Sequence, residues 1–194
     1  MKNEERIISI SKMADIKENP LIYEEKKIWS KSYSSATAVL FVCWGNICRS
    51  PMAEFIFKNM VKKAGLESEF HIESRATHTD EIWNGQGNPV YSPAREKLAE
   101  HGISCKGKRA QLLTKSDYED YDYIIGMDDL NYRWMHRILG KSVPDSKISL
   151  LMDYTSHPRS VADPWYTGDF DATYIDVVEG CEGFLEYLRK EGKI

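Results

Sequence analysis

Residues 38–51 read Ala-Val-Leu-Phe-Val-Cys-Trp-Gly-Asn-Ile-Cys-Arg-Ser-Pro. The apolar run predicts a buried strand that ends at Cys43, the glycine-containing segment predicts a tight loop, and Pro51 opens a helical pattern. Loop N–H groups and the positive end of the helix dipole then meet near Cys43, which suits a phosphate dianion and lowers the pKa of a cysteine held there. Arg49 adds a planar fork that can hold two phosphate oxygens. The stretch therefore predicts a phosphate-transfer site with a thiolate nucleophile.

Strand-like apolar runs alternate with amphipathic helical patterns from residue 36 onward. We expect strands at about 38–43, 70–74, 123–127 and 147–151, and helices at about 51–64, 93–101, 128–139 and 171–190. Ser50 is the expected N-cap of the first helix, with Pro51 as its first residue. The alternation predicts an α/β fold of three layers, in which a four-stranded parallel sheet carries helices on both faces. The phosphate-binding loop would join the first strand to the first helix, where ligands of such sheets bind.

Length and composition fit one domain with an appended segment. The chain has 194 residues, of which 42% are hydrophobic and 29% charged, and a net charge of −4. Residues 1–35 are rich in Lys, Glu, Ser and Asn, so we expect an N-terminal extension or linker, partly disordered or lying across the surface, before a domain at 36–194. The acidic balance argues against nucleic-acid binding. No membrane-spanning or signal-peptide pattern is found, which predicts a cytoplasmic protein.

The cysteines predict reactive chemistry at one loop and no metal site. Their four positions are Cys43, Cys48, Cys105 and Cys181. Neither a Cys-x-x-Cys pair nor a metal-ligand spacing to histidine occurs, so we expect no metal and no cofactor. Cys43 and Cys48 share the loop and either form a protective disulfide on oxidation or act as independent thiols. Cys181 belongs to the apolar stripe of the last helix and is expected in the core.

Residues 39–54 resemble the signature of the low-molecular-weight protein tyrosine phosphatases of bacterial type. The match continues in family order through Ser74–Thr77, Gly87–Pro89, His101–Ile103, Gly126–Asp128 and Asp163–Tyr166. The loop alone is moderately specific, whereas the loop joined to a downstream Asp-Pro-aromatic-Tyr is highly specific. The resemblance implies metal-independent hydrolysis of phosphotyrosine in proteins, a bacterial tyrosine kinase among the substrates, and inorganic phosphate as product and inhibitor.

The residues themselves support a two-step mechanism. Cys43 would attack phosphorus and form a cysteinyl-phosphate, while Arg49 stabilises the transferring group. Asp163 would act first as general acid and then as general base, although Asp-Pro read alone is a turn. Ser50 would hydrogen-bond the thiolate, and Asn46 would take an unusual backbone conformation. The phosphate-binding set is Trp44, Gly45, Asn46, Ile47, Cys48, Arg49 and Ser50.

Aromatic side chains are expected to form the slot above this loop. Trp165 and Tyr166 would wall it, with Trp44 and Trp83 opposite, although Trp83 fits a packing role equally well. Trp44 stands where the family commonly has a smaller aliphatic residue. A histidine that many members carry after the His101–Ile103 match is also missing. There the chain has a stretch that we expect at the surface, with Cys105, Lys106, Lys108 and Arg109; His78 and His157 are likewise expected at the surface.

Other functions fit the sequence less well. Arsenate reductases of this fold need further closely spaced cysteines, which the chain lacks downstream. In the protein-arginine phosphatases of the family a threonine stands at the place of Ile47, and the aromatic pair after Asp-Pro is missing. A non-catalytic phosphotyrosine-binding module would lack the nucleophile, the arginine or the acid. The classical phosphatases carry histidine before the cysteine, where this chain has Val42, and an upstream acid.

Overall fold

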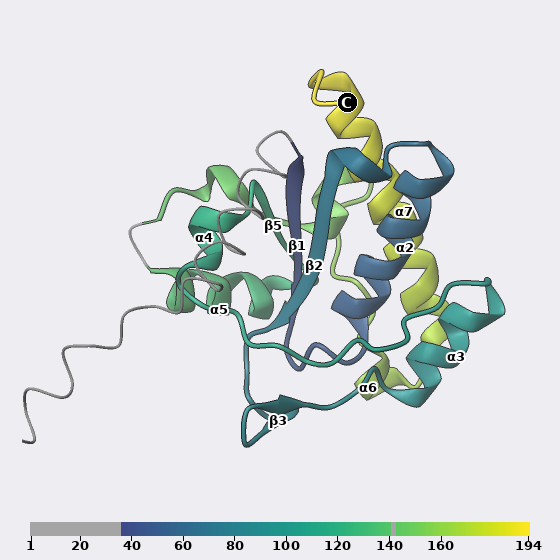
Figure 1. Cartoon of the computed structure of the whole chain (residues 1–194), viewed down its shortest axis with the longest axis vertical. Coiled ribbons are helices and arrows are strands. Elements are labelled where there is room, and N and C mark those ends of the chain that lie inside the picture. Colours follow the sequence, from purple (N-terminus) through teal and green to yellow (C-terminus); the bar gives the residue numbers. More distant parts are fainter. Residues whose placement is uncertain (1–35, 141–142) are drawn as a thin grey trace, which may run out of the picture. The chain divides into compact units, whose positions relative to one another are not determined.

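The computed structural model describes residues 36–140 and 143–194, so the extension predicted at 1–35 lies outside the described residues. Four parallel strands form the central sheet in the order β2-β1-β5-β6 (Figure 1). They are β1 (Thr37–Cys43), β2 (Phe70–Ala76), β5 (Tyr123–Gly126) and β6 (Ile148–Leu150). The predicted four-stranded parallel sheet is confirmed.

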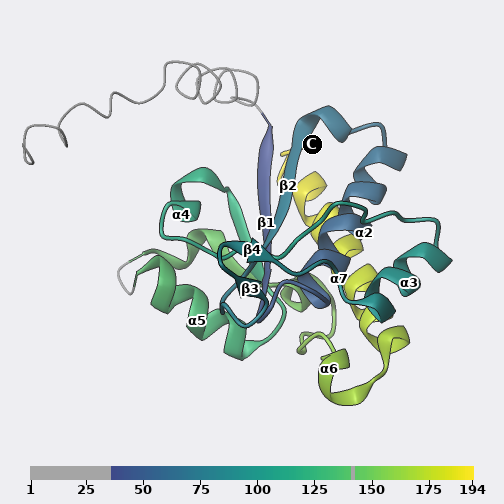
Figure 2. The ribbon, with the colours of Figure 1, turned by 60° about the horizontal axis from the view of Figure 1, so that its bottom comes forward.

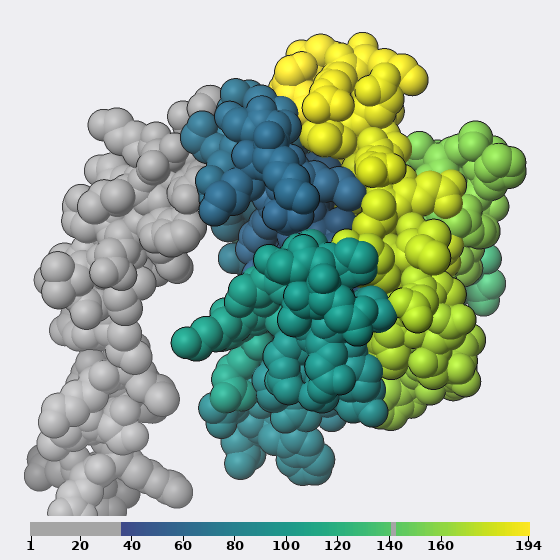
Figure 3. Space-filling model, turned by 90° about the vertical axis from the view of Figure 1, so that its right-hand side faces the viewer, coloured from purple at the N-terminus to yellow at the C-terminus, as the bar shows by residue number. Residues whose placement is uncertain are grey.

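Helices cover both faces of this sheet (Figure 1). One layer holds α2 (Arg49–Lys63), α3 (Ser92–Glu100) and α7 (Phe170–Lys190), and the other holds α4 (Asp117–Asp120) and α5 (Asp129–Leu139). In the space-filling view of Figure 3, α7 in yellow borders the blue segment with α2 and the teal segment with α3. The three-layer α/β architecture expected from the alternating pattern is therefore present.

Strand β1 lies between two cores because its side chains alternate. Val39 and Phe41 face the cluster formed with α2 and α7, whereas Leu40 and Val42 face the cluster formed with α5. All four side chains are fully buried. A central parallel strand that is covered on both faces has a continuous apolar sequence, and for this reason the apolar run predicted β1 correctly.

Short elements gather at the end of the sheet where β1 leads into its loop (Figure 2). They are the hairpin of β3 (Ile82–Trp83) and β4 (Gln86–Gly87) and the short helix α6 (Pro164–Thr167). Three 3₁₀ turns, η1 (Glu67–Glu69), η2 (Asp145–Lys147) and η3 (Leu151–Tyr154), complete the described elements. Their length is too small for periodicity to reveal them.

Two boundaries differ from the sequence-based prediction by more than one residue. Strand β2 runs on to Ala76, which pairs with Cys43. The charged Arg75 hid this extension in the sequence, and its guanidinium pairs with Glu73 at 2.5 Å. Helix α2 begins at Arg49, so the expected N-cap Ser50 lies inside the helix and makes no cap hydrogen bond.

Helix α7 approaches η3 closely through two glycines. A Cβ atom at Gly180 would lie 2.5 Å from Leu151 Cγ, and one at Gly183 would lie 2.3 Å from the Tyr154 carbonyl oxygen. The chain leaves η3 toward Asp163 and α6, so this contact anchors the segment that carries Asp163. Among the described residues, no helix combines the length and the apolar character needed to cross a bilayer.

Candidate active site

The loop between β1 and α2 forms the floor of a cavity of about 360 Å³. Cys43, at the end of β1, is 4% exposed, and its Sγ lies 3.0 Å from Ser50 Oγ. Six residues of the predicted phosphate loop reach the cavity: Cys43, Trp44, Gly45, Ile47, Cys48 and Arg49. Asn46 and Ser50 are fully buried beneath the loop.

Asn46 holds the loop in shape from below. Its φ of 56° is left-handed, as the sequence predicted for this position. The side-chain Nδ2 donates to Ser50 Oγ at 2.9 Å and to Ser74 Oγ at 2.8 Å, and Oδ1 accepts from the Gln111 backbone N–H at 3.0 Å. All hydrogen-bonding groups of the buried amide are thus used, which fixes its orientation.

Arg49 is 4% exposed and joins two carboxylates from distant parts of the chain. Its Nη1 lies 2.5 Å from Asp128 Oδ2, and its Nη2 lies 2.7 Å from Asp163 Oδ2. Burial by itself lowers the pKa of Arg49. The negative charges of Cys43, Asp128 and Asp163 outweigh burial and raise that pKa above its ordinary value.

Asp128 is a site residue that the sequence analysis did not single out, because it stood there only at the start of a predicted helix and at the end of the Gly126–Asp128 match. Its Oδ1 does cap α5 by accepting from the Asn131 N–H at 2.7 Å, while Oδ2 pairs with Arg49. Both carboxylate oxygens are therefore engaged. The signal available in the sequence was the Gly126–Asp128 match, which placed this carboxylate at the carboxyl end of a central strand.

Asp163 lies at the cavity beside the loop, although 120 positions separate it from Cys43. It caps α6, because Oδ1 accepts from the Trp165 N–H at 3.1 Å. The other oxygen, Oδ2, contacts Arg49. The three residues predicted to be catalytic, Cys43, Arg49 and Asp163, thus line one cavity.

Three of the four expected aromatic side chains line the cavity: Trp44, Trp165 and Tyr166. Trp165 is 62% and Tyr166 is 85% exposed, so both rings stand at its mouth. Trp83 lies in hairpin β3–β4, is 74% exposed and is not among the lining residues. Trp83 therefore does not line this cavity with the other three rings.

Trp44 is held rigidly in the cavity wall. Its Nε1 donates to Asp80 Oδ2 at 2.7 Å, and its ring stacks on His78 with centroids 3.3 Å apart and planes 7° from parallel. His78, expected at the surface, is in fact half-buried between Trp44 and Trp134. Burial lowers the pKa of His78, and Asp80 acts against that shift. The other histidine expected at the surface, His157, is exposed.

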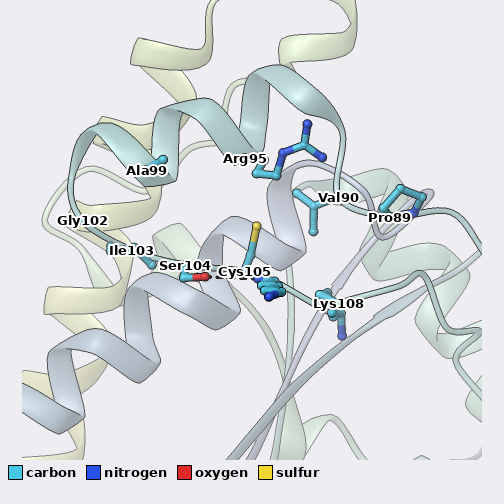
Figure 4. Close-up of a pocket in the computed structure, with 11 residues that line it drawn as sticks. Pro89, Val90, Arg95, Ala99, Gly102, Ile103, Ser104, Cys105 and Lys108 are labelled. Atoms are coloured by element: carbon cyan, nitrogen blue, oxygen red, sulfur yellow. Dashed lines mark hydrogen bonds between the residues drawn. The ribbon is translucent and has the colours of Figure 1, made fainter.

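The loop after Ile103 also differs from expectation. Cys105 is buried, and the Lys108 side chain is only 9% exposed, because Lys108 Nζ reaches Glu54 Oε2 at 2.8 Å and the Ser74 carbonyl at 3.0 Å. Figure 4 shows both side chains in the wall of a second cavity, of about 420 Å³. Lys106 and Arg109 are exposed, as predicted. Lysines so close together in a sequence usually lie at the surface, and only the fold shows that Lys108 contacts the buried Glu54.

The remaining cysteines are buried free thiols. Burial above all, and the charges of Cys43 and Asp163, raise the pKa of Cys48 to about 12, although Arg49 acts in the opposite direction. Burial likewise raises the pKa of Cys105 and that of Cys181. Cys181 is fully buried in the core, as its place on the apolar stripe of α7 predicted.

Comparisons with known proteins identify the family of this chain. A model of the family described as low molecular weight phosphotyrosine protein phosphatase matches residues 38–194. Low molecular weight protein-tyrosine-phosphatase YfkJ of Bacillus subtilis is 39% identical over 159 residues, which are 81% of this chain and 99% of the relative. The crystal structure of YfkJ superposes with a TM-score of 0.76 at 38% identity and covers 81% of this chain and 97% of that one.

Two further solved structures share the fold at the level of a family. The low molecular weight protein tyrosine phosphatase of Streptococcus pyogenes is 40% identical, with a TM-score of 0.68 and coverage of 78% of this chain and 93% of that one. DARP, the drosophila arginine phosphatase, is 30% identical, with a TM-score of 0.70 and coverage of 78% and 97%. The site around Cys43 and these likenesses lead to one conclusion: the chain belongs to the low molecular weight phosphotyrosine protein phosphatases, which are phosphoric monoester hydrolases.

Proposed function

We propose that this phosphatase hydrolyses phosphotyrosine in proteins through a cysteinyl-phosphate on Cys43, with Asp163 as general acid and base and without a metal. The observation that carries the proposal is the convergence of Cys43, Arg49 and Asp163 on one cavity. A nucleophile, a bidentate cation and a carboxylate are what a metal-free phosphate transfer requires.

In the first step the Cys43 thiolate attacks phosphorus, so that an S–P bond forms as the bond from phosphorus to the tyrosine oxygen breaks. Loop N–H groups and Arg49 stabilise the charge on the equatorial oxygens. Asp163 gives its proton to the leaving phenolate. Ser50 Oγ, 3.0 Å from the sulfur, stabilises the thiolate by a hydrogen bond.

In the second step a water molecule attacks the phosphorus of the cysteinyl-phosphate. Asp163, now a carboxylate, takes the proton from this water, and the S–P bond breaks to restore the Cys43 thiolate and release inorganic phosphate. The position of Asp163 in the lining of the same cavity as Cys43 supports its use in both steps. Its contact with Arg49 keeps the carboxylate at the loop.

The lining of the cavity favours an aryl phosphate. Trp44, Trp165 and Tyr166 supply faces on which a phenyl ring can stack, and the Ile47 side chain adds apolar surface. The drosophila relative is an arginine phosphatase, and the carboxylates of Asp80 and Glu81 also line this cavity, so the choice of an aryl phosphate rests on its aromatic and apolar side chains. Turnover of matched phosphotyrosine and phosphoarginine peptides tests the choice, and faster turnover of phosphoarginine would contradict it.

Arsenate reduction has less support from the structure. That chemistry would pass a disulfide from Cys43 to further thiols, yet Cys105 and Cys181 are buried and their pKa values are raised. Both are therefore poor nucleophiles at neutral pH. Their positions fit packing, and the assignment to phosphate-ester hydrolysis stands.

Cys43→Ser tests the mechanism directly. The hydroxyl is a far weaker nucleophile than the thiolate, so turnover of a phosphotyrosine peptide should be abolished. Binding of inorganic phosphate should persist, because the loop N–H groups and Arg49 remain. Surviving turnover in Cys43→Ser would refute the cysteinyl-phosphate mechanism.

The proposed partners are phosphotyrosine proteins, including a bacterial tyrosine kinase, with inorganic phosphate as product and competitive inhibitor and the cytoplasm as compartment. We further propose redox sensitivity: peroxide oxidises the Cys43 thiolate to a sulfenic acid, and the Cys48 thiol then displaces water from it to form a Cys43–Cys48 disulfide. Because the pKa of Cys48 is about 12, its thiol is protonated at neutral pH and closes the disulfide slowly unless pH rises. Mass spectrometry after peroxide treatment at two pH values should therefore find more disulfide at the higher pH; equal amounts would contradict this role of Cys48.

A further inference from the structure

Beneath the phosphate loop lies a buried carboxylate with three donors. Glu54, on α2, has a side chain that is 4% exposed. Its Oε2 accepts from Ser74 Oγ at 2.5 Å and from Lys108 Nζ at 2.8 Å, and its Oε1 accepts from Lys58 Nζ at 2.6 Å. Lys58 is 40% exposed, whereas Lys108 is 9% exposed, so Lys108 is the buried counter-ion of this carboxylate.

This carboxylate sets the direction of the hydrogen bond from Ser74, and the Asn46 amide, oriented by the Gln111 N–H on its Oδ1, sets the direction of the next ones. A carboxylate only accepts, so Ser74 must give its single proton to Glu54 and can only accept from Asn46. The Asn46 amide in turn donates its second hydrogen to Ser50. Ser50 thus accepts from Asn46 and keeps its own proton, for which the Cys43 sulfur at 3.0 Å is a nearer acceptor than the Arg75 carbonyl oxygen at 3.5 Å.

We propose that Lys108 is a positioning residue of the phosphatase: it keeps Glu54 an acceptor, so that Ser74 stays an acceptor for the Asn46 amide, and this amide holds Ser50 beside Cys43. The inference rests on the proposed function of Cys43. Lys108 lies in the stretch after Ile103, where this chain lacks the histidine that many members of the family carry.

The surroundings of Lys108 explain why its charge matters. Burial, reinforced by Arg75, lowers the pKa of Lys108, while Glu54 and Glu73 act against the shift. Arg75 and Glu73 on β2 pair with each other at 2.5 Å, and Lys58 occupies the other oxygen of Glu54. Removal of the ammonium group would therefore leave the buried Glu54 carboxylate with the neutral Ser74 hydroxyl and a partly exposed lysine, Lys58, as its only donors, a costly arrangement. In Figure 4 the Lys108 amine points away from the Cys105 sulfur.

The test compares Lys108→Met, which keeps an unbranched apolar side chain, with Lys108→Arg, which keeps the charge. We expect Lys108→Met to lower kcat for a phosphotyrosine peptide by about tenfold with KM nearly unchanged, because a charge-assisted hydrogen-bond network is lost at the nucleophile. Lys108→Arg should recover most of kcat. Lys106→Met is the matched control, because Lys106 lines the same second cavity and is exposed.

A second readout needs no turnover. The rate at which iodoacetamide alkylates Cys43, followed by peptide mapping between about pH 5 and 8, reports how much thiolate Ser50 stabilises. We expect Lys108→Met to slow this alkylation at the acidic end of the range, and Lys108→Arg and Lys106→Met to leave it near the wild-type rate. The alkylation result remains interpretable even if the wild type fails to hydrolyse phosphotyrosine, which would refute the proposed function alone.

Three outcomes would overturn the proposal. One is an unchanged kcat and alkylation rate in a folded Lys108→Met variant, with folding checked by thermal unfolding. Another is a fall in kcat for Lys108→Arg as large as that for Lys108→Met. Because arginine keeps the positive charge, that result would show that the packing of the lysine side chain, and not its charge, matters. If Lys108→Met does not fold, Lys108→Gln replaces it, because glutamine is a neutral hydrogen-bond donor. A wild-type kcat and a wild-type alkylation rate in Lys108→Gln would be the third outcome that overturns the proposal.

Discussion

Arg49 contacts two carboxylates that each have a second structural role in this site. Its two terminal nitrogens reach Asp128 and Asp163, and each of these carboxylates uses its second oxygen to cap a helix. The geometry of the catalytic groups is therefore tied to the starts of α5 and α6. A residue that looks like an ordinary helix cap in sequence can, for this reason, also orient the arginine of the phosphate loop.

Asp163→Ala probes the proposed general acid. We expect kcat for aryl phosphates with poor leaving groups to fall by about 10²–10⁴-fold, because their phenolates need a proton as they depart. The kcat of Asp163→Ala for nitrophenyl phosphate should fall much less, since nitrophenolate is a good leaving group and departs without a proton. Equal losses across a series of leaving groups would refute the acid role, and would assign Asp163 only to the orientation of Arg49.

Trp44→Leu probes the wall of the cavity. Trp44 is fixed by Asp80 and His78, so its face is pre-organised for a phenyl ring. We expect its loss to raise KM for a phosphotyrosine peptide by about three- to tenfold, the usual worth of an aromatic contact. Trp83→Leu is the comparison variant and should have a smaller effect, because Trp83 does not line the cavity. A larger rise of KM in Trp83→Leu would restore the sequence-based role of Trp83.

At the scale of elements, contacts far from Cys43 hold the catalytic segment in place. Helix α7 packs on η3 through Gly180 and Gly183, and the chain continues from η3 to Asp163. On the other side of the site, β2 runs past its predicted end and pairs Ala76 with Cys43. Helical periodicity predicted α7 well, whereas the η3 contact depends on residues about 30 positions apart in the chain.

Gly183→Ala tests the contact between α7 and η3. The new Cβ would lie 2.3 Å from the Tyr154 carbonyl oxygen, so the helix or the turn must move. We expect the free energy of unfolding to fall by about 1–3 kcal/mol, as for other overpacked sites. Glu182→Ala, at the exposed neighbouring position, is the control and should change stability little. Urea unfolding measures both, and equal stability of Gly183→Ala and wild type would show that the contact is not tight.

At the scale of the whole domain, the site exists only when distant segments are assembled. Cys43 and Arg49 come from the β1–α2 junction, Asp128 from the end of β5, and Asp163 from the start of α6. All of them lie beyond the carboxyl ends of the parallel strands, as is usual for such sheets. Ligands of this site should therefore bind the folded chain and not the unfolded chain.

Inorganic phosphate should accordingly stabilise the protein. At a phosphate concentration of about 100 Kd, binding to the folded state alone adds about 2.7 kcal/mol to the free energy of unfolding. Thermal unfolding with and without phosphate measures this as a higher Tm. Arg49→Met should abolish most of the increase, because its two phosphate donors are gone; an increase as large as in the wild type would place the anion elsewhere.

The sequence by itself determined the layers of the fold, the phosphate loop and the candidate catalytic trio. Apolar runs and helical periodicity are local signals, and residues 43–50 are contiguous, so both can be read without a structure. The pairing of Arg49 with Asp128, the stack of Trp44 on His78 and the buried pair of Lys108 and Glu54 were decided by tertiary structure. Each depends on the burial of polar groups from segments far apart in the chain, and burial is a property of the assembled fold that no local pattern encodes.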